Sequence, residues 1–132
     1  MALSTEQIHE ILKELEVSRA ADLKSKDLDR LVTNNYHPDG IMIMHGPDGV
    51  KTFYGREAHK EAVRPFLFAD NTDSQLTTTY VESSRDGEFI IRCGTYQFGS
   101  STKEHKFEVI FRKLNGKYLI YHQDVHYCPD SP

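Results

Sequence analysis

The sequence predicts an α+β fold in which helices cover one face of a curved, mixed but mainly antiparallel β-sheet. Two observations carry this prediction. Apolar residues recur at helical spacing near the start of the chain and again after residue 55, whereas alternating segments separated by turn signals fill residues 76–127. The 132 residues suffice for one hydrophobic core. We therefore expect a single domain over residues 1–132, with its core over about residues 4–127.

Two helices are predicted at the start of the chain. Ser4 and Gln7 have the spacing of a capping box, and apolar residues then recur every three or four positions. The first helix is expected to run from about Thr5 to Asp22 or Leu23. Ser25 is expected to begin a shorter helix, Lys26 to about Asn34, which the Asn-Asn and Pro-Asp-Gly sequences terminate.

A β-hairpin, a third helix and a meander of strands are expected next. Residues 41–45 are apolar on both parities, which predicts a strand buried on both faces, and a Gly-Pro-Asp-Gly turn leads to a strand at 50–54. A third helix is expected from Gly55, with a kink or a stop around Arg64 because Pro65 removes a backbone hydrogen bond. Four antiparallel strands are predicted at residues 76–84, 89–98, 104–114 and 117–127. Gly94 is expected to mark a bend that lets the sheet curl.

Composition and charge exclude several classes of function. The chain has 16 lysines and arginines against 20 acids, a net charge of −4, and its basic residues are interleaved with acids. Nucleic-acid binding and membrane binding are therefore not expected, and no apolar run reaches the length of a membrane span. Cys93 and Cys128 lack metal-type spacing and are interpreted as reduced thiols, with a disulfide as the alternative. Together with a start unlike a signal peptide, this favours a cytoplasmic location, and no cofactor is expected.

The last predicted hairpin carries the most informative pattern of the chain. Asn115-Gly116 is typical of a two-residue hairpin turn. Pairing outward from this turn gives Leu114 opposite Lys117, Phe111 opposite Ile120, Val109 opposite His122, Phe107 opposite Asp124 and His105 opposite His126. His122, Asp124 and His126 alternate along the strand and are therefore expected to share one face with these apolar residues. An apolar surface with ionisable groups at one end is typical of a small-molecule pocket.

The polar residues of this hairpin are candidates for acid–base chemistry. We expect His122 to act as a general base, Asp124 to orient its ring, and His45 to act as an electrophile or to bind an anionic group. The ligand-binding surface is expected to comprise Tyr36, Met44, Arg92, Tyr96, Phe107, Val109, Phe111, Ile120 and His126.

Two other interpretations of this cluster remain open. In the first, His122 and Asp124 form a hydrogen-bonded pair at the solvent-exposed rim of the sheet, with His105 and His126 in solvent. In the second, His122, Asp124 and His126 on one face of the strand, with His105 across from them, bind zinc through three or four ligands. No other feature of the sequence supports a metal, so no metal site is assigned.

Four short motifs, in their order along the chain, resemble those of the nuclear transport factor 2-like superfamily and, within it, SnoaL-like domains. They are Lys26-Asp27-Leu28-Asp29, Phe53-Tyr54-Gly55-Arg56-Glu57-Ala58, Arg92-Cys93-Gly94-Thr95-Tyr96 and Asn115-Gly116-Lys117-Tyr118-Leu119-Ile120. The resemblance covers roughly Ser4 to Tyr127. It implies a cystatin-like cone, in which a curved sheet surrounds a cavity that the long helices close on one side. It also implies a homodimer through the convex face of the sheet.

The resemblance does not imply one activity, because the superfamily includes isomerases, cyclases, dehydratases, transport factors and kinase association domains. The three positions that carry the catalytic groups of ketosteroid isomerases hold other residues here. The end of the chain is similar to the calcium/calmodulin-dependent kinase II association domain, which has a histidine at the position of His122 and an arginine near Arg92 that enters the cavity. The resemblance therefore keeps two classes of function open, namely enzymes that act on small molecules and non-catalytic association domains.

The sequence also predicts the dimer interface independently of the resemblance. The face opposite the histidines is expected to be rich in tyrosine and apolar residues, as interface centres are. The interface is expected to comprise Ile110, Leu119, Tyr121, Gln123, Val125 and Tyr127. The alternative is that another element of the same chain covers this face. We therefore expect a small-molecule-binding domain with acid–base chemistry of the isomerase, cyclase or dehydratase class, or a non-catalytic association module with a vestigial pocket.

Overall fold

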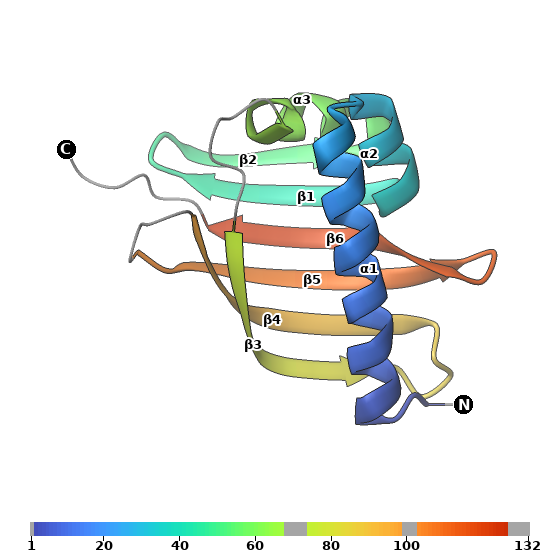
Figure 1. The fold of residues 1–132 in the computed structure, drawn as a ribbon. Helices are drawn as coiled ribbons and strands as arrows, with labels where there is room; N and C mark the ends of the chain where they lie inside the picture. Colours follow the sequence, from blue (N-terminus) through green and yellow to red (C-terminus); the bar gives the residue numbers. More distant parts are fainter. Residues whose placement is uncertain (1, 68–73, 99–102, 127–132) are drawn as a thin grey trace.

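Within the part of the chain that the structure describes, three helices and six strands occur in the order that the sequence predicts (Figure 1). The structure is a computed structural model, and it describes residues 2–67, 74–98 and 103–126. The elements are α1 (Thr5–Ser25), α2 (Leu28–Asn35), β1 (Tyr36–Gly46), β2 (Gly49–Tyr54), α3 (Gly55–Leu67), β3 (Ser74–Ser83), β4 (Phe89–Phe98), β5 (His105–Leu114) and β6 (Lys117–His126). The predicted α+β class is confirmed.

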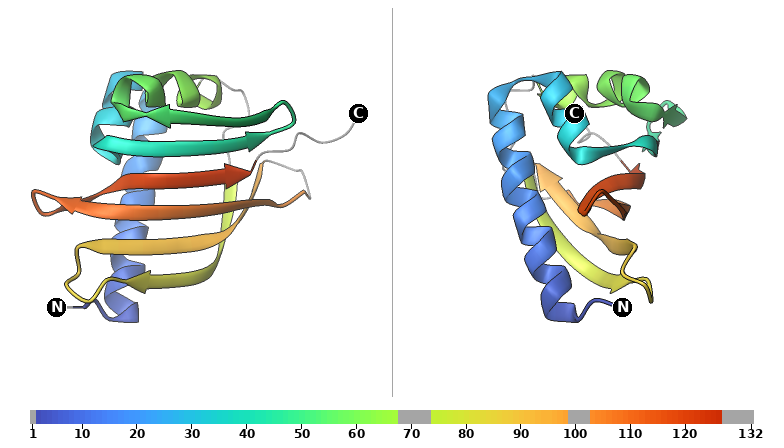
Figure 2. Two further views of the ribbon diagram at one scale, coloured as in Figure 1. Left: turned by 180° about the vertical axis from the view of Figure 1, so that it is seen from behind. Right: turned by 90° about the vertical axis from the view of Figure 1, so that its right-hand side faces the viewer.

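The six strands form one mixed sheet in the order β2-β1-β6-β5-β4-β3. Every neighbouring pair is antiparallel except β1 and β6, which are parallel and lie about 80 residues apart along the chain. Helix α1 crosses one face of the sheet, and α2 and α3 lie beside β1 and β2 (Figures 1 and 2). We call the face that packs against α1 the inner face and the opposite one the outer face.

The first helix forms as its sequence dictates. The hydroxyl of Ser4 accepts a hydrogen bond from the backbone N–H of Gln7, whose side chain accepts one from the backbone N–H of Ser4, so the predicted capping box is confirmed. The helix ends at Ser25, followed by Lys26 in the left-handed conformation (φ 57°). Its apolar stripe buries Ile8 and Leu12, each contributing about 1.5–3 kcal/mol to stability.

The second helix begins differently from the prediction. Its N-cap is Asp27, whose carboxylate accepts a hydrogen bond from the backbone N–H of Arg30, whereas Ser25 belongs to the end of α1. The buried carboxylate of Asp22 then joins the two helices, because it accepts hydrogen bonds from Arg30 Nε (2.8 Å) and Asn35 Nδ2 (2.9 Å). This network fixes the angle at which α2 leaves α1 and delivers the chain into the sheet.

Two further boundaries differ from those predicted. Strand β1 begins at Tyr36, so the Pro-Asp-Gly segment lies within an irregular strand instead of a terminating loop. Helix α3 continues past Pro65 to Leu67. Since Pro65 lies near the end of the helix, it removes one hydrogen bond without disrupting the turns that precede it. Within the described residues, no helix has the length and apolar character needed to cross a membrane.

The hydrophobic core lies between α1, α2, α3 and the inner face of the sheet. Val32 of α2, Tyr36 of β1 and Ile90 of β4 have no measurable exposure (0%), so these three elements each place a residue at the centre of the core. The ring of Tyr36 lies 4.9 Å from that of His59 on α3, so β1 and α3 share this centre. The remaining core members are Ile8, Leu12, Leu31, Met42, Ala62, Val63, Tyr96, Phe107, Val109, Phe111, Tyr118 and Ile120.

Candidate functional site

A β-bulge in β6 decides which residues reach each face of the sheet. Phe111 lies opposite Ile120, as predicted, but Ile110 then lies opposite His122, so Tyr121 is an extra residue in β6. Beyond the bulge the pairing differs by one residue from the predicted one, and Asp124 faces Glu108. Because successive strand residues point to opposite faces, this shift turns every later side chain of β6 over. The predicted common face of the histidines with Phe107 and Val109 is therefore wrong.

Residues far away in the sequence hold this bulge in place. The pairing of β1 with β6 also shifts between Tyr36 and Ile41, and a Cβ atom on Gly40 would lie 3.2 Å from the Ile120 carbonyl oxygen. The ring of Tyr121 lies edge-on to that of His37, with centroids 5.0 Å apart. Burial lowers the pKa of His37, which favours the neutral ring at this contact. The bulge thus depends on the close approach of β1.

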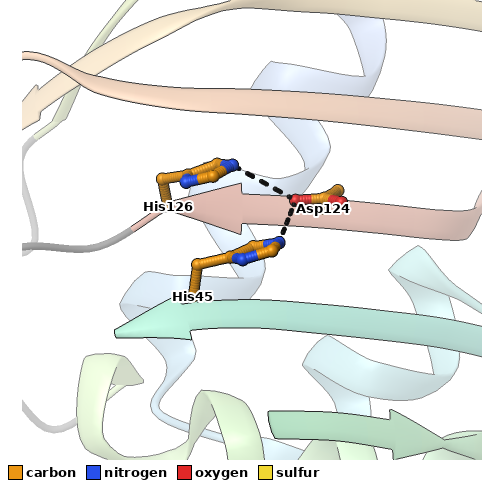
Figure 3. A group of neighbouring side chains, drawn as sticks. All are labelled: His45, Asp124 and His126. Carbon is orange, nitrogen blue, oxygen red and sulfur yellow. Dashed lines mark ion pairs between the residues drawn. The ribbon is translucent and has the colours of Figure 1, made fainter. Parts of the chain in front are cut away.

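The outer face carries a cluster of three polar side chains at the ends of β1 and β6 (Figure 3). Nε2 of His45 lies 2.9 Å from Oδ1 of Asp124, and Nε2 of His126 lies 3.6 Å from the same oxygen. The two imidazole rings stack with centroids 4.1 Å apart and planes 2° apart. Their neighbours Met44 and Val125 pack on the core, so strand alternation places the cluster on the opposite face. The structure thus brings two of the three predicted catalytic residues, His45 and Asp124, together.

His122 does not join this cluster. It lies between Ile110 and Ile41 on the outer face, and its Nδ1 atom is buried without a hydrogen-bond partner among the described residues. The predicted pairing of His122 with Asp124 therefore has no counterpart in the structure. His126, predicted to bind ligand alongside the apolar residues, belongs to the outer-face cluster instead.

His105 lies on the inner face, away from the other histidines. It pairs with Tyr96 of β4, and the two rings lie 5.1 Å apart. Only 6% of His105 is exposed. The alternative zinc set of His122, Asp124 and His126 with His105 does not form, because the bulge places these β6 residues on the other side of the sheet from His105.

The middle of the inner face is a row of one residue per strand: Val81, Arg92, Val109, Gln123, Met42 and Phe53. Arg92 points inward, as the resemblance implies, because its Nη1 lies 2.7 Å from Oε1 of Glu16 on α1. Its Nε donates a hydrogen bond to Thr78 Oγ1 (2.9 Å), and its guanidinium lies 5.9 Å from the centroid of the Phe107 ring. Arg92 is thus a cation, paired with Glu16, on a mainly apolar surface.

Two polar residues that the sequence did not place on the ligand-binding surface, Gln123 and Arg19, also lie on the inner face. Gln123 is 8% exposed, and its Oε1 atom makes no hydrogen bond to any residue that the structure describes. Arg19 Nε is likewise buried and unpartnered within the described part, while Nη2 of the same residue donates to the Tyr36 hydroxyl (3.5 Å). Arg19 continues the stripe Ile8-Leu12-Leu15 at helical spacing, a signal that would have identified it.

The predicted ligand-binding residues divide between the two faces. Eight of them lie on the inner face: Tyr36, Met44, Arg92, Tyr96, Phe107, Val109, Phe111 and Ile120. The ninth, His126, lies on the outer face. The Tyr96 hydroxyl donates to the backbone carbonyl of His126 (3.1 Å), which ties β4 to the end of β6.

The predicted interface residues also divide. Ile110, Leu119 and Tyr121 lie on the outer face, where the guanidinium of Arg112 lies 5.1 Å from the centroid of the Tyr121 ring. Gln123 and Val125 point inward because of the bulge, which corrects their assignment to the interface. Tyr127 lies outside the described residues.

Cys93 has the character of an unreactive thiol. It is a free cysteine on the outer face of β4, paired with Glu108 of β5. Burial raises the pKa of the Cys93 thiol, and the Glu108 carboxylate raises it further. The thiol is therefore protonated near neutral pH and a poor nucleophile. Cys128 lies outside the described residues.

Solved structures with this fold include NTF2-like and cystatin-like proteins. An NTF-2-like protein of unknown function from Shewanella oneidensis MR-1 superimposes with a TM-score of 0.67 at 13% identity, over 90% of this chain and 98% of that chain. A cystatin-like-fold protein from Nostoc punctiforme gives 0.63 at 15% identity, over 100% of this chain and 98% of that one. A putative calcium/calmodulin-dependent protein kinase II association domain from Xanthomonas campestris gives 0.64 at 19% identity, over 91% and 87%.

The likeness to these proteins extends to the fold alone. No protein-family model matches the chain, and no curated protein matches it. The resemblance to the nuclear transport factor 2-like superfamily is thus confirmed for the architecture. The fold by itself does not determine the activity of this chain.

Proposed function

We propose that the inner face binds a small molecule with an apolar body and a polar or anionic group. The observation that carries the proposal is the buried, unpartnered amide oxygen of Gln123 in the same row as Arg92, among the residues that the structure describes. A buried polar group without a partner costs stability, so its retention favours a role in recognition. A cytoplasmic location, expected from the sequence, is part of this proposal.

The spacing of the polar groups and their chemistry suit such a ligand. Arg92 and Gln123 both pair with Val109, so their Cα atoms are separated by two strand spacings, about 10 Å. A carboxylate or carbonyl above Val109 would accept from Arg92, while the amide of Gln123 offers both a donor and an acceptor. Phe107, Phe111 and Ile120 supply an apolar wall beside these groups. The acid–base chemistry expected of His122, Asp124 and His45 is not part of this proposal, because these residues lie on the outer face.

The test compares binding and stability in the same variants. A panel of aromatic and alicyclic carboxylates is screened by saturation-transfer NMR against the native chain, Arg92→Met and Gln123→Leu. We expect both variants to lose the ligands that the native chain binds. We also expect Gln123→Leu to be more stable than the native chain by about 1–3 kcal/mol, since it removes an unsatisfied buried polar group.

Gln97→Leu is the matched control, because it makes the same chemical change on the outer face of β4. It should leave ligand binding unchanged. A panel that yields no binder, or binders that ignore both inner-face substitutions, would refute the proposal.

A second proposed function is association through the outer face. The outer-face row that contains His122 also holds Ile41, Ile91 and Ile110, an apolar belt across four strands. Apolar surface of this kind is typical of interface centres. We expect a dimer in light scattering at micromolar concentration and its dissociation in Ile110→Lys. Val50→Lys, at the exposed edge strand β2, should leave the dimer intact, and a native chain that stays monomeric would exclude association.

A further inference from the structure

The outer-face cluster contains two buried polar atoms that face one another without forming a hydrogen bond. Nε2 of His45 and Oδ1 of Asp124 are each inaccessible to solvent, although about a third of each side chain is exposed (32% and 31%). The atoms are 2.9 Å apart, yet neither has a hydrogen-bond partner among the described residues. The two atoms are close, but the angles between them do not suit a shared proton. Ligand atoms around a common metal ion are arranged in this way.

We propose that His45, Asp124 and His126 form a binding site for a divalent transition-metal ion, with zinc as the representative ion. One ligand atom from each residue lies within 4.8 Å of the other two. With metal–ligand distances of about 2.1 Å, separations of 2.9 Å and 3.6 Å correspond to angles at the ion of about 90° and 120°. Both angles lie within the range of four- and five-coordinate zinc.

The sheet holds the three ligands on a rigid frame. His45 and His126 are direct neighbours in the parallel ladder of β1 and β6, and Asp124 precedes His126 by two residues on the same face. The stacked rings point their nitrogen lone pairs in parallel, so one ring must turn toward the ion. His126 has 54% of its side chain exposed and is free to make this turn. Ion binding should therefore break the stacking while leaving the backbone in place.

The ligand chemistry selects the class of ion. Two imidazole nitrogens and one carboxylate suit zinc and its first-row neighbours, whereas magnesium and calcium prefer oxygen ligands throughout. Three protein ligands also leave at least one coordination position for water or another ligand. The zinc set considered from the sequence already contained Asp124 and His126. Its other members, His105 and His122, lie apart from them in the structure, and His45 of β1 completes the group instead.

The competing explanation is a simple surface ion pair between the histidines and Asp124. Such a pair needs no ion and contributes little to stability when its side chains are partly exposed. It also predicts that added zinc leaves the two rings stacked. The two explanations therefore differ in stoichiometry, in residue dependence and in the NMR signals of the rings.

The test is titration of the full chain, freed of any affinity-tag histidines, with zinc chloride alone in a non-coordinating buffer. Isothermal titration calorimetry should give one zinc per chain, and the imidazole signals of His45 and His126 should shift together. Loss of one ligand should weaken binding at least about tenfold in His126→Gln and in Asp124→Asn. His9→Gln, an exposed histidine on α1, is the matched control and should bind as the native chain does.

Three outcomes would overturn the proposal: no zinc binding to the native chain, binding that His126→Gln leaves unchanged, or equal weakening in His9→Gln. A further readout separates it from ligand binding at the inner face. Gln123→Leu should retain the zinc affinity of the native chain, because its side chain lies on the other side of the sheet. Cobalt substitution then reports the geometry, since four-coordinate cobalt absorbs visible light much more strongly than six-coordinate cobalt.

Discussion

Replacing Gly94 with alanine should destabilise the protein more than replacing Gly116 with alanine. A Cβ atom on Gly94 would lie 2.0 Å from the carbonyl oxygen of Thr77 and 3.2 Å from Cζ of Phe107. Since ordinary contact begins near 3.4 Å, β3 and β4 would have to separate by more than 1 Å at the β3 bulge between Thr78 and Tyr80. This position lets the two strands bend together around the core.

The expected cost follows from these distances. Overpacking contributes about 1–3 kcal/mol, and each backbone hydrogen bond lost as the strands separate adds about 1 kcal/mol. The lower flexibility of alanine in the unfolded chain returns about 0.4–1 kcal/mol. The net loss should therefore be about 2–4 kcal/mol, which at a urea slope of about 2 kcal/mol/M lowers the unfolding midpoint by about 1–2 M.

The assay is urea unfolding followed by circular dichroism, with Gly116→Ala as the control. Gly116 has φ +83° in the β5–β6 turn, and no atom lies within 4 Å of the position that an added Cβ would take. Its replacement therefore costs only conformational strain, about 1–2 kcal/mol. A Gly94→Ala variant no less stable than Gly116→Ala would refute the argument from close strand approach.

Two further predictions concern α3. Burial lowers the pKa of His59 below its ordinary 6.5, so the unfolded chain binds more protons than the folded chain in mild acid. Stability measured by urea unfolding should be full above about pH 6.5 and fall as the pH drops, and the fall should be less steep in His59→Gln. An equally steep fall in His59→Gln would contradict this role of the buried ring. Arg56 donates from Nε to the Tyr36 carbonyl (3.1 Å), so Arg56→Ala should cost about 1–3 kcal/mol, while the exposed Arg64→Ala should cost less than about 0.5 kcal/mol. Equal midpoints for the two arginine variants would contradict this assignment.

The helices and the order of strands follow from local patterns in the sequence. The capping box at Ser4 and the apolar stripe of α1 are properties of neighbouring residues, and both predictions are confirmed. The turn at Asn115-Gly116 is local as well, with Asn115 at φ 52° and Gly116 at φ 83°, and it correctly pairs Phe111 with Ile120. The boundary errors at Ser25 and Pro65 arose where several local signals compete within a few residues.

The fold class, the hairpin turn and the inward Arg92 were thus accessible from the sequence, Arg92 through the family resemblance. The face on which the polar residues of β6 lie was decided by tertiary structure. The extra residue at Tyr121 depends on Gly40 and His37 of β1, which are about 80 residues away along the chain and become neighbours only when the sheet forms. Because strand side chains repeat every two residues, one inserted residue is enough to exchange the inner and outer faces. The same exchange brings His45 and Asp124 together on the outer face and places Gln123 beside the core.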